Sequence, residues 1–423
     1  MKKIVVNIQP SLDDGEPPTY FVEADGVDRA TKRLDLSGIT PLEGPQSILK
    51  VGEALADLLV KHDRIEKAFD RALAVAVGEP SVPIYFFIGV DTAVPLSWEA
   101  LRRSKQFLAL DPRWPIARFP RSGSIDSATE VPFAPPLRMV SVISAVGVDG
   151  KAEWDSIFGA VQAAPAELPI ELTVITGDRN VVAAARGHLP PERIIPLPGP
   201  DDPMPLVSRI DACGPHLLHI FCHGAVREEQ AVLEFATASD FNAGTSSVVL
   251  TAIEIAQQVS RNNTWMVHLN ACRSAQAGSE VLTHAEEFVN TGVPVAIGMK
   301  RLIDVSDAVV FSAGFYRSVF ARIAEILARG AGRSEIAWAE TMLSARRQLR
   351  NIHVHNPAEG DAWTVPVMYT RRGPFTLEVA AAGVTEPQVQ QALSETRLID
   401  GLAELIAADA PEVAADLRAV SEK

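Results

Sequence analysis

The sequence predicts an α/β protein with a mainly parallel sheet flanked by helices. From Val82 onward, short apolar runs alternate with segments of helical periodicity, and this alternation is typical of parallel sheets whose faces are covered by helices. The apolar runs are also nearly continuous, as in strands that are buried on both faces.

Each element follows from its local pattern. Residues 3–9 and 20–23 predict a strand pair, with a turn signal at Asp13-Asp14-Gly15 between them. A helix is expected next, because Ile48, Val51, Leu55, Leu58 and Leu59 share one face at helical spacing. Further strands are expected over 84–90, 138–145, 171–176, 217–221, 265–269 and 293–299, helices over 154–164 and 181–187, and a loop or joint over the proline-rich stretch 119–136.

Composition excludes several classes of function. The 423 residues are enough for two or three domains, and the net charge of −14 argues against a nucleic-acid-binding surface. Three cysteines are too few to suggest a disulfide framework, and no apolar stretch is long enough to span a membrane. Without a phosphate-binding loop or metal-ligand spacing, we expect no cofactor and no metal, and a cytoplasmic location.

A histidine and a cysteine follow two of the predicted strands. Leu217 to Phe221 leads into Cys222-His223-Gly224, and Trp265 to Leu269 leads into Asn270-Ala271-Cys272-Arg273-Ser274. Parallel strands end at one edge of a sheet, so both side chains are expected at that edge. His223 and Cys272 are 49 residues apart, close to the spacing in caspases.

These residue types suit nucleophilic catalysis. A cysteine thiolate is a strong nucleophile, and a neighbouring histidine can take its proton and later protonate the leaving amine. The N–H groups of Gly224 and Cys272 would suit an oxyanion hole. The alternative is structural, because cysteines and strand histidines are often buried core residues.

Several motifs resemble the CHAT domain, a branch of the caspase-like cysteine peptidases that also includes separase. They are Cys222-His223-Gly224, Leu269 to Ser274, Ala296-Ile297-Gly298-Met299-Lys300, the Pro-Trp-Glu-x-Leu-like stretch Pro95 to Leu101, and Trp363 to Tyr369, which is similar to the family's last strand. The resemblance covers roughly residues 80 to 380. It implies a caspase-like sheet with His223 as the base and Cys272 as the nucleophile.

The resemblance also suggests how the chain is divided. Such proteins often carry a degenerate half before the active half, and we expect the same order here. The expected units are an N-terminal strand pair with helices of unknown function at 1–80, the start of the CHAT domain at 81–130, the caspase-like catalytic CHAT region at 131–380, and an acidic tail at 381–423, expected to form a short helical hairpin.

Substrate preference rests on the loop after the strand at 293–299. In separase-like relatives an acid in this loop is associated with reading a basic residue before the cut bond, which implies Asp304 or Asp307 as the substrate-binding carboxylate. Two alternatives remain open. Arg273, Lys300 and Arg301 would instead select an acidic residue, and Asp307 would instead cap the following helix.

Two functions are therefore weighed. The first is a regulated cysteine endopeptidase that cuts one or a few protein substrates, in prokaryotic-type signalling or antiviral defence. The second is a catalytically silent caspase-like scaffold that binds partners. Retention of His223, Gly224 and Cys272 together favours the peptidase. No 34-residue helical repeat is present, so we expect a separate activating or sensor protein.

Overall fold

A computed structural model defines the fold. It describes residues 3–11, 16–24, 31–39, 45–121, 128–199, 204–227, 230–237, 248–261, 263–271, 280–301, 303–355, 360–381, 383–406, 411–413 and 415. The expected turn at Asp13-Asp14-Gly15 lies outside these residues, as do Cys272 and Arg273.

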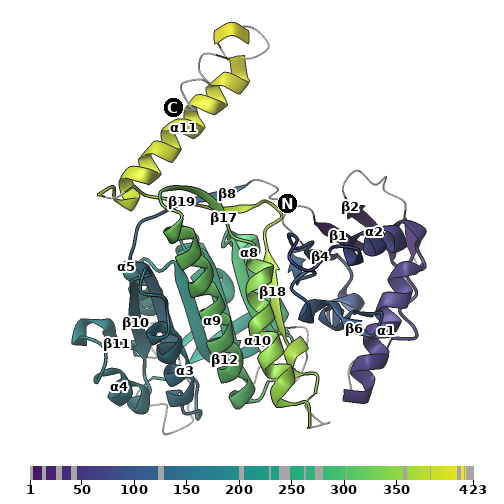
Figure 1. The fold of residues 1–423 in the computed structure, drawn as a ribbon. Coiled ribbons are helices and arrows are strands. Elements are labelled where there is room, and N and C mark those ends of the chain that lie inside the picture. Colours follow the sequence, from purple (N-terminus) through teal and green to yellow (C-terminus); the bar gives the residue numbers. More distant parts are fainter. Residues whose placement is uncertain are drawn as a thin grey trace.

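A large, mainly parallel sheet organises the described chain (Figure 1). Its strands, in spatial order, are β11 (Ile194–Pro196), β10 (Ile170–Thr176), β9 (Leu137–Ile143), β12 (Leu217–Arg227), β15 (Met266–Ala271), β16 (Val295–Met299), β18 (Pro366–Thr370), β7 (Ile116–Phe119), β4 (Ile84–Ile88), β1 (Ile4–Gln9), β2 (Thr19–Ala24) and β3 (Lys32–Arg33). Only the pairs β16–β18, β1–β2 and β2–β3 in this series are antiparallel. The predicted α/β class is confirmed.

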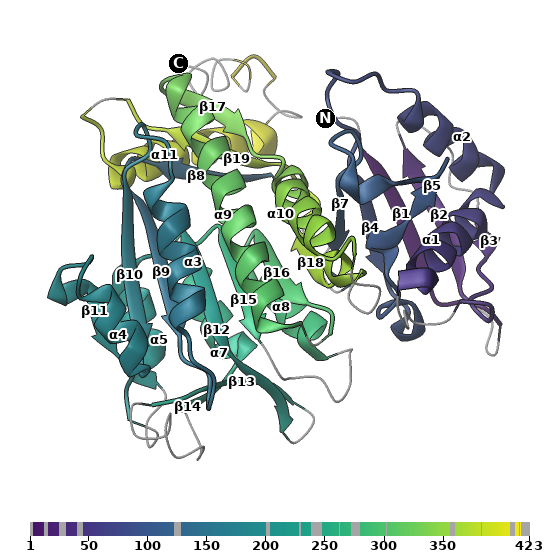
Figure 2. The same ribbon diagram turned by 60° about the horizontal axis from the view of Figure 1, so that its bottom comes forward.

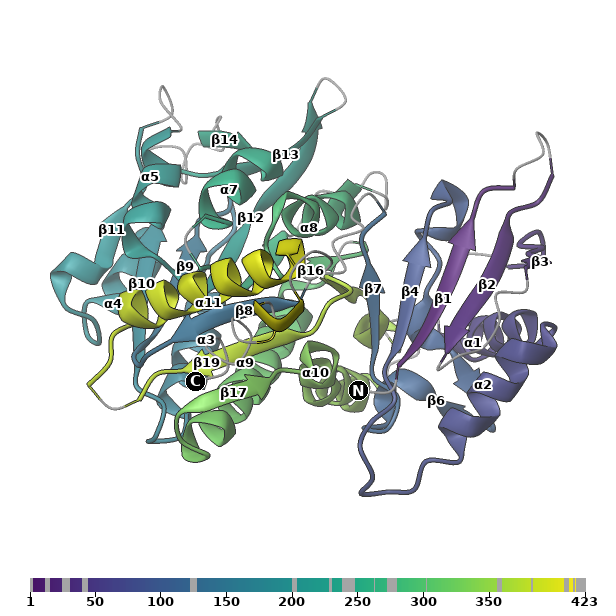
Figure 3. The same ribbon diagram turned by 90° about the horizontal axis from the view of Figure 1, so that it is seen from above.

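Helices cover both faces of the central strands, as the buried apolar runs predict (Figures 2 and 3). One face carries α3 (Lys151–Gln162), α9 (Val305–Ala328) and α10 (Trp338–Ile352), with α4 (Arg179–Ala185) packed beside α3. The other face carries α5 (Met204–Cys213), α7 (Ala252–Val259) and α8 (Glu280–Thr291). Among the described residues, no helix is both long and apolar enough to cross a membrane.

The strand that carries His223 is longer than the sequence indicated. The apolar run predicts an end at Phe221, but β12 continues to Arg227. The extension pairs antiparallel with β13 (Gln230–Phe235), which in turn pairs with β14 (Val248–Thr251). His223 and Gly224 therefore lie within a strand rather than in a loop, because β13 satisfies backbone groups beyond the edge of the main sheet.

The expected loop at 119–136 contains a strand. β8 (Thr129–Phe133) pairs parallel with β19 (Phe375–Val379), which pairs antiparallel with β17 (Gly332–Glu335). Pro132 is tolerated in β8 because this strand lies at the edge of the small sheet, where a missing N–H costs no ladder bond. This small sheet crosses one end of the main sheet (Figure 1).

The N-terminal section contains β1–β4, β7 and two helices, α1 (Pro45–Val60) and α2 (Asp63–Leu73), with a short ribbon of β5 (Arg102–Arg103) and β6 (Gln106–Phe107). The predicted strand pair and the predicted apolar face of α1 are confirmed, since Ile48, Val51, Leu55, Leu58 and Leu59 are buried. Short 3₁₀ turns at Asp91–Ala93, Trp98–Ala100 and Leu108–Leu110 link β4 to β7.

A single pair of residues continues the sheet from this section to the remaining strands. β7 pairs with β18 at one position only, Tyr369 opposite Arg118. We call the β7–β18 contact the seam. It brings together segments about 250 residues apart in the sequence and lies between the purple-blue strands and the green strands of Figure 2.

Within the acidic tail, the structure describes one long helix, α11 (Glu386–Ile406). Its first residue anchors it, because the Glu386 carboxylate accepts a hydrogen bond from Arg138 at 2.8 Å and lies 2.9 Å from His216 Nε2. Most of the second arm of the expected hairpin falls outside the described residues.

Candidate active site

The carboxyl ends of β9, β12, β15 and β16 meet at one edge of the sheet, which we call the carboxyl edge. β12 and β15 are parallel neighbours, with Cys222 opposite Ala271. The residues just before His223 and just before Cys272 are therefore side by side. The prediction that the two strands end at one edge of the sheet is confirmed as far as Cys222 and Ala271.

His223 belongs to the face covered by α3 and α9. Side chains alternate along a strand, so residues 219, 221 and 223 of β12 share one face. His219 on that face lies 3.0 Å from the Tyr316 hydroxyl of α9 and 3.1 Å from the Glu153 carboxylate of α3. His268 of β15 contacts His219 edge to face, so 268 and 270 are on the same side.

A backbone carbonyl fixes the tautomer of His223. Its Nε2 lies 2.6 Å from the carbonyl oxygen of Val146, and His223 is buried, with 8% of its surface exposed. A carbonyl oxygen only accepts, so Nε2 carries hydrogen and donates it. In the neutral ring, the lone pair that can take a proton is consequently on Nδ1.

The loop after β9 holds this carbonyl in place. Ser144 N–H donates to Phe221 O at 2.9 Å, and Val148 N–H donates to Ala145 O at 3.2 Å. Gly147 has a φ of +67°, which favours a residue without a Cβ. Sequence reasoning missed Val146, because a backbone carbonyl acts whatever its side chain and leaves no signal in the residue type.

The described thiols are poorly placed to be the nucleophile. Cys222 is fully buried and alternates to the face opposite His223, and burial raises the pKa of Cys213 on α5. Cys272, the predicted nucleophile, is outside the described residues. Gly224, predicted for the oxyanion hole, lies in β12 opposite Leu233 of β13.

The two predicted substrate-binding carboxylates have different surroundings. Asp304 is exposed and caps α9, accepting from Ser306 N–H at 2.8 Å and from its hydroxyl at 2.7 Å, and these bonds lower its pKa. Asp307 is buried, with Oδ1 2.5 Å from His353 Nε2. The cap considered for Asp307 is thus made by Asp304, three residues earlier.

Two of the basic residues that were considered for selecting an acidic substrate residue, Lys300 and Arg301, form contacts within the protein. Lys300 is buried and donates to the Ser97 hydroxyl at 2.6 Å, and Arg301 pairs with Asp361 at 2.5 Å. Arg273 is outside the described residues.

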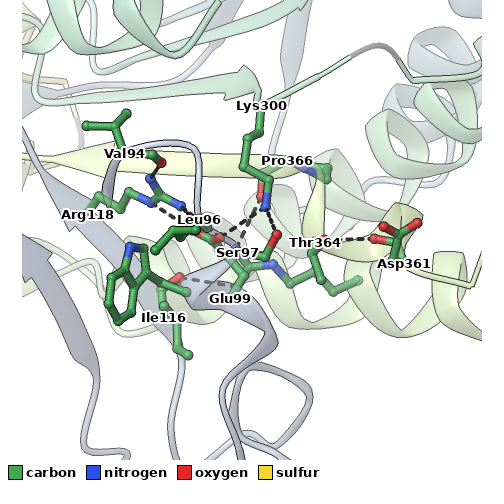
Figure 4. Close-up of polar contacts among 12 residues, drawn as sticks. Val94, Leu96, Ser97, Glu99, Ile116, Arg118, Lys300, Asp361, Thr364 and Pro366 are labelled. Carbon is green, nitrogen blue, oxygen red and sulfur yellow. Dashed lines mark hydrogen bonds and ion pairs between the residues drawn. The ribbon is translucent and has the colours of Figure 1, made fainter. Parts of the chain in front are cut away.

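Lys300 joins a buried charge cluster at the seam (Figure 4). Arg118 donates twice to Glu99 at 2.9 Å, and the ammonium of Lys300 lies 3.7 Å from the same carboxylate. Burial lowers the pKa of Lys300 to about 7, against the opposing effect of Glu99. Burial alone would raise the pKa of Glu99, but Arg118 and Lys300 lower it, so the carboxylate is the charged partner of both.

A family model of the CHAT domain matches residues 124–369, and the chain belongs to this family. The matched range includes His223, Cys272 and both aspartates, whereas Pro95 to Leu101 precedes it. Among solved structures, the separase–securin complex of Saccharomyces cerevisiae is similar, with 11% identity and a TM-score of 0.38. The match covers 76% of this chain and 17% of that chain. No curated protein matches the sequence.

Proposed function

We propose that this CHAT protein is a regulated cysteine endopeptidase whose His223–Cys272 dyad hydrolyses peptide bonds in one or a few proteins. The main support is the register of β12 and β15, which pairs the residue before His223 with the residue before Cys272. The proposal requires the Cys272 thiol to lie on the same side of the sheet as His223, the side that His268 of β15 shares with His219.

The chemistry follows from the tautomer of His223. Because Nε2 donates to Val146 O, Nδ1 takes the proton from the Cys272 thiol, and the thiolate attacks the scissile carbonyl. The N–H groups of Gly224 and Cys272 stabilise the oxyanion. The proton on Nδ1 then passes to the leaving amine, and water hydrolyses the acyl-enzyme.

An electrophilic peptide probe tests the dyad directly. In the presence of the activating protein, we expect the probe to label Cys272 in the wild type. Cys272→Ala should not be labelled at this position, and His223→Ala should be labelled much more slowly. Loss of the base lowers the labelling rate by roughly 10²–10⁴-fold. Mass spectrometry of labelled peptides identifies the modified residue.

Cys213→Ala provides the matched control, because Cys213 is a partly exposed thiol on α5, remote from the carboxyl edge. It should be labelled like the wild type. No labelling of Cys272 under any condition, with the fold intact, would favour the silent scaffold. A comparison of new protein N-termini in cells with wild type and Cys272→Ala identifies the substrate.

We further propose that Asp304 selects a basic residue before the cut bond. Of the two candidates, Asp304 is the exposed carboxylate, whereas Asp307 is buried against His353. In Asp304→Asn the helix cap is retained, since Asn caps about as well as Asp, and only the charge is lost.

The expected result is a fall of roughly tenfold or more in kcat/KM for peptides with Arg at this position, with little change for neutral peptides. Matched fluorogenic peptides measure both. An Arg preference that survives Asp304→Asn rules out this carboxylate as the selecting group.

A separate activating or sensor protein, and a place in prokaryotic-type signalling or antiviral defence in the cytoplasm, remain part of the proposal. The labelling experiment with and without candidate partners tests the first of these.

A further inference from the structure

One loop determines how the ring of the proposed base is oriented. The loop runs from Ser144 to Gly150, between β9 and α3, and its Val146 carbonyl accepts the Nε2–H of His223 at 2.6 Å. This carbonyl belongs to the backbone, so the Val146 side chain does not direct it at the ring. Its direction depends on the contacts that hold the loop.

The segment Gly177-Asp178, between β10 and α4, contacts both ends of this loop. At the first end, the Gly177 N–H donates to Ser144 Oγ at 3.2 Å. At the other end, the Gly150 N–H donates to the Asp178 carboxylate, with 2.7 Å between N and Oδ2. Two adjacent residues from the neighbouring strand–helix connection therefore hold both ends of the loop that carries the Val146 carbonyl.

The Asp178 carboxylate lies in the protein interior. Asp178 is fully buried, and its other oxygen, Oδ1, accepts from the Asn180 N–H at 2.7 Å as the N-cap of α4. The Asp178 N–H donates to Thr176 Oγ1 at 2.9 Å. Each carboxylate oxygen thus pairs with a backbone N–H, which offsets the cost of burying this group. One oxygen caps α4, and the other holds the loop.

Close packing restricts the same end of the loop. Gly150 is the N-cap residue of α3, and a Cβ at this position would lie 2.5 Å from Ile143 Cγ2 and 3.2 Å from Val181 Cγ2. Only a residue without a Cβ fits this closely between β9 and α4. The Gly150 N–H consequently reaches Asp178, and the end of the loop has little room to move.

We propose that Asp178 is a positioning residue for His223, the proposed base. By holding the Gly150 end of the loop, it keeps the Val146 carbonyl directed at Nε2, so that the lone pair that takes the thiol proton stays on Nδ1. Asp178 acts through the loop and not on the substrate. The inference rests on the proposed function, because the role exists only in a reaction that His223 carries out.

An amide at position 178 separates the two roles of the carboxylate. Asn caps helices about as well as Asp, so in Asp178→Asn the amide oxygen keeps the bond to the Asn180 N–H. The amide nitrogen, which only donates, then faces the Gly150 N–H, and the bond to the loop is lost. Asp178→Ala is the second variant, because it removes the loop bond whichever way the amide turns.

NMR of the His223 ring tests its orientation. In the full chain with ¹⁵N-labelled histidine, the Nε2–H bonded to Val146 should give a proton signal that is protected from exchange with water, and His223→Gln assigns it among the nine histidines. Asp178→Asn and Asp178→Ala should lose this signal, because the carbonyl is no longer held against the ring. The measurement needs neither Cys272 nor an activating protein.

Labelling of Cys272 by the electrophilic peptide probe tests the effect on the reaction. With the activating protein, the maximum labelling rate of Asp178→Asn should be roughly 10- to 100-fold below that of the wild type, because the base is misoriented. The probe concentration at half-maximal rate should stay similar, because probe binding is retained. A loss of folded protein would instead lower the final amount of label at an unchanged rate.

Asp111→Asn is the matched control. Asp111 is also a buried aspartate that accepts from the N–H two residues later, that of Arg113, but it lies in the N-terminal section. This variant should keep the His223 signal and the wild-type labelling rate. An unchanged His223 signal in both Asp178 variants would overturn the proposal, as would its equal loss in Asp111→Asn. A wild type that is never labelled would refute the peptidase function, and the NMR signal would still show whether Asp178 orients the ring.

Discussion

The imidazole of His268 lies in the interior behind the carboxyl edge, with both ring nitrogens unpaired in the described structure. Phe311, Phe315 and Tyr316 surround it, and burial holds its pKa well below the usual value. A neutral ring without hydrogen-bond partners opposes folding, because the polar nitrogens lose their water.

His268→Leu is therefore expected to raise the free energy of unfolding by about 1–3 kcal/mol at neutral pH, because the unpaired nitrogens are removed at similar volume. The pH dependence has a definite sign. Below about pH 6.5 the unfolded chain protonates His268 and the folded chain does not, so the wild type loses stability as the pH falls. The variant should lose less over the same range.

Urea unfolding at pH 7 and pH 5.5 measures both effects. His355→Leu is the control, because His355 is exposed and its replacement should change stability by less than about 0.5 kcal/mol. A destabilised His268→Leu would instead mean that the imidazole makes a contact that compensates for its burial.

At the same scale, the sequence predicts residue types better than their geometry. His223 is identifiable from its position after an apolar run, but the atom that bears its lone pair depends on the Val146 carbonyl, 77 positions earlier. From the sequence, Asp307 is the residue considered as a cap of the following helix. Only the helix start at Val305 and the nearby His353 assign the cap to Asp304 and a buried pair to Asp307.

At the scale of elements, periodicity predicts what is buried locally. The apolar stripe of α1 and the apolar runs of β9, β10 and β15 appear where the sequence indicates them. The errors occur where pairing partners are remote. β12 continues past Phe221 because β13 pairs with it, and β8 exists because β19, some 240 residues later, provides its ladder. Neither the extension of β12 past Phe221 nor β8 has an apolar run long enough to reveal it.

Element ends depend on similar remote contacts. Glu386 looks like an ordinary acidic first-turn residue in sequence, which is favourable at a helix start. In the structure it anchors α11 to Arg138 of β9 and to His216, which directly precedes the neighbouring strand β12. Burial would raise the pKa of Glu386, but its bonds to His216 and Arg138 lower it, so it stays charged at neutral pH.

At the scale of the whole molecule, the seam is the feature that no local pattern indicates. A single pair of residues continues the sheet between β18 and β7, and side chains provide the rest of the contact. Lys300, which follows β16, reaches across the seam to Glu99 and Ser97, and Arg346 of α10 donates to the carbonyls of Ile116 and Pro366 on the two seam strands. Arg118 of β7 holds Glu99 in place from the same side of the seam. The Pro-Trp-Glu-like stretch thus has a structural role here, through its glutamate.

This cluster holds more positive than negative charge. Arg118, Lys300 and Arg346 surround Glu99, while Arg301 beside them is balanced by Asp361. Among these cations Lys300 loses its proton most readily, since burial lowers its pKa to about 7, whereas burial lowers the pKa of Arg346 only to about 10. The compact ammonium is the group whose desolvation is least compensated.

The charge state of Lys300 makes the stability of the whole chain depend on pH. Between about pH 7 and pH 10.4 the unfolded chain keeps the Lys300 proton and the folded chain has released it. Since the unfolded state binds more protons, the free energy of unfolding rises with pH in this window, by up to about 1.4 kcal/mol per pH unit from this group. Below pH 7 both the folded and the unfolded chain carry the Lys300 proton, so this group no longer makes the free energy of unfolding depend on pH.

In Lys300→Met the rise of the free energy of unfolding between about pH 7 and pH 10.4 should disappear, and the variant should be more stable than the wild type at pH 7. Urea unfolding at pH 7, 8 and 9 gives the slope, with the exposed Lys67→Met as the control that should keep the wild-type slope. Identical slopes in all three proteins would show that Lys300 remains charged in the folded chain and that Glu99 balances it fully.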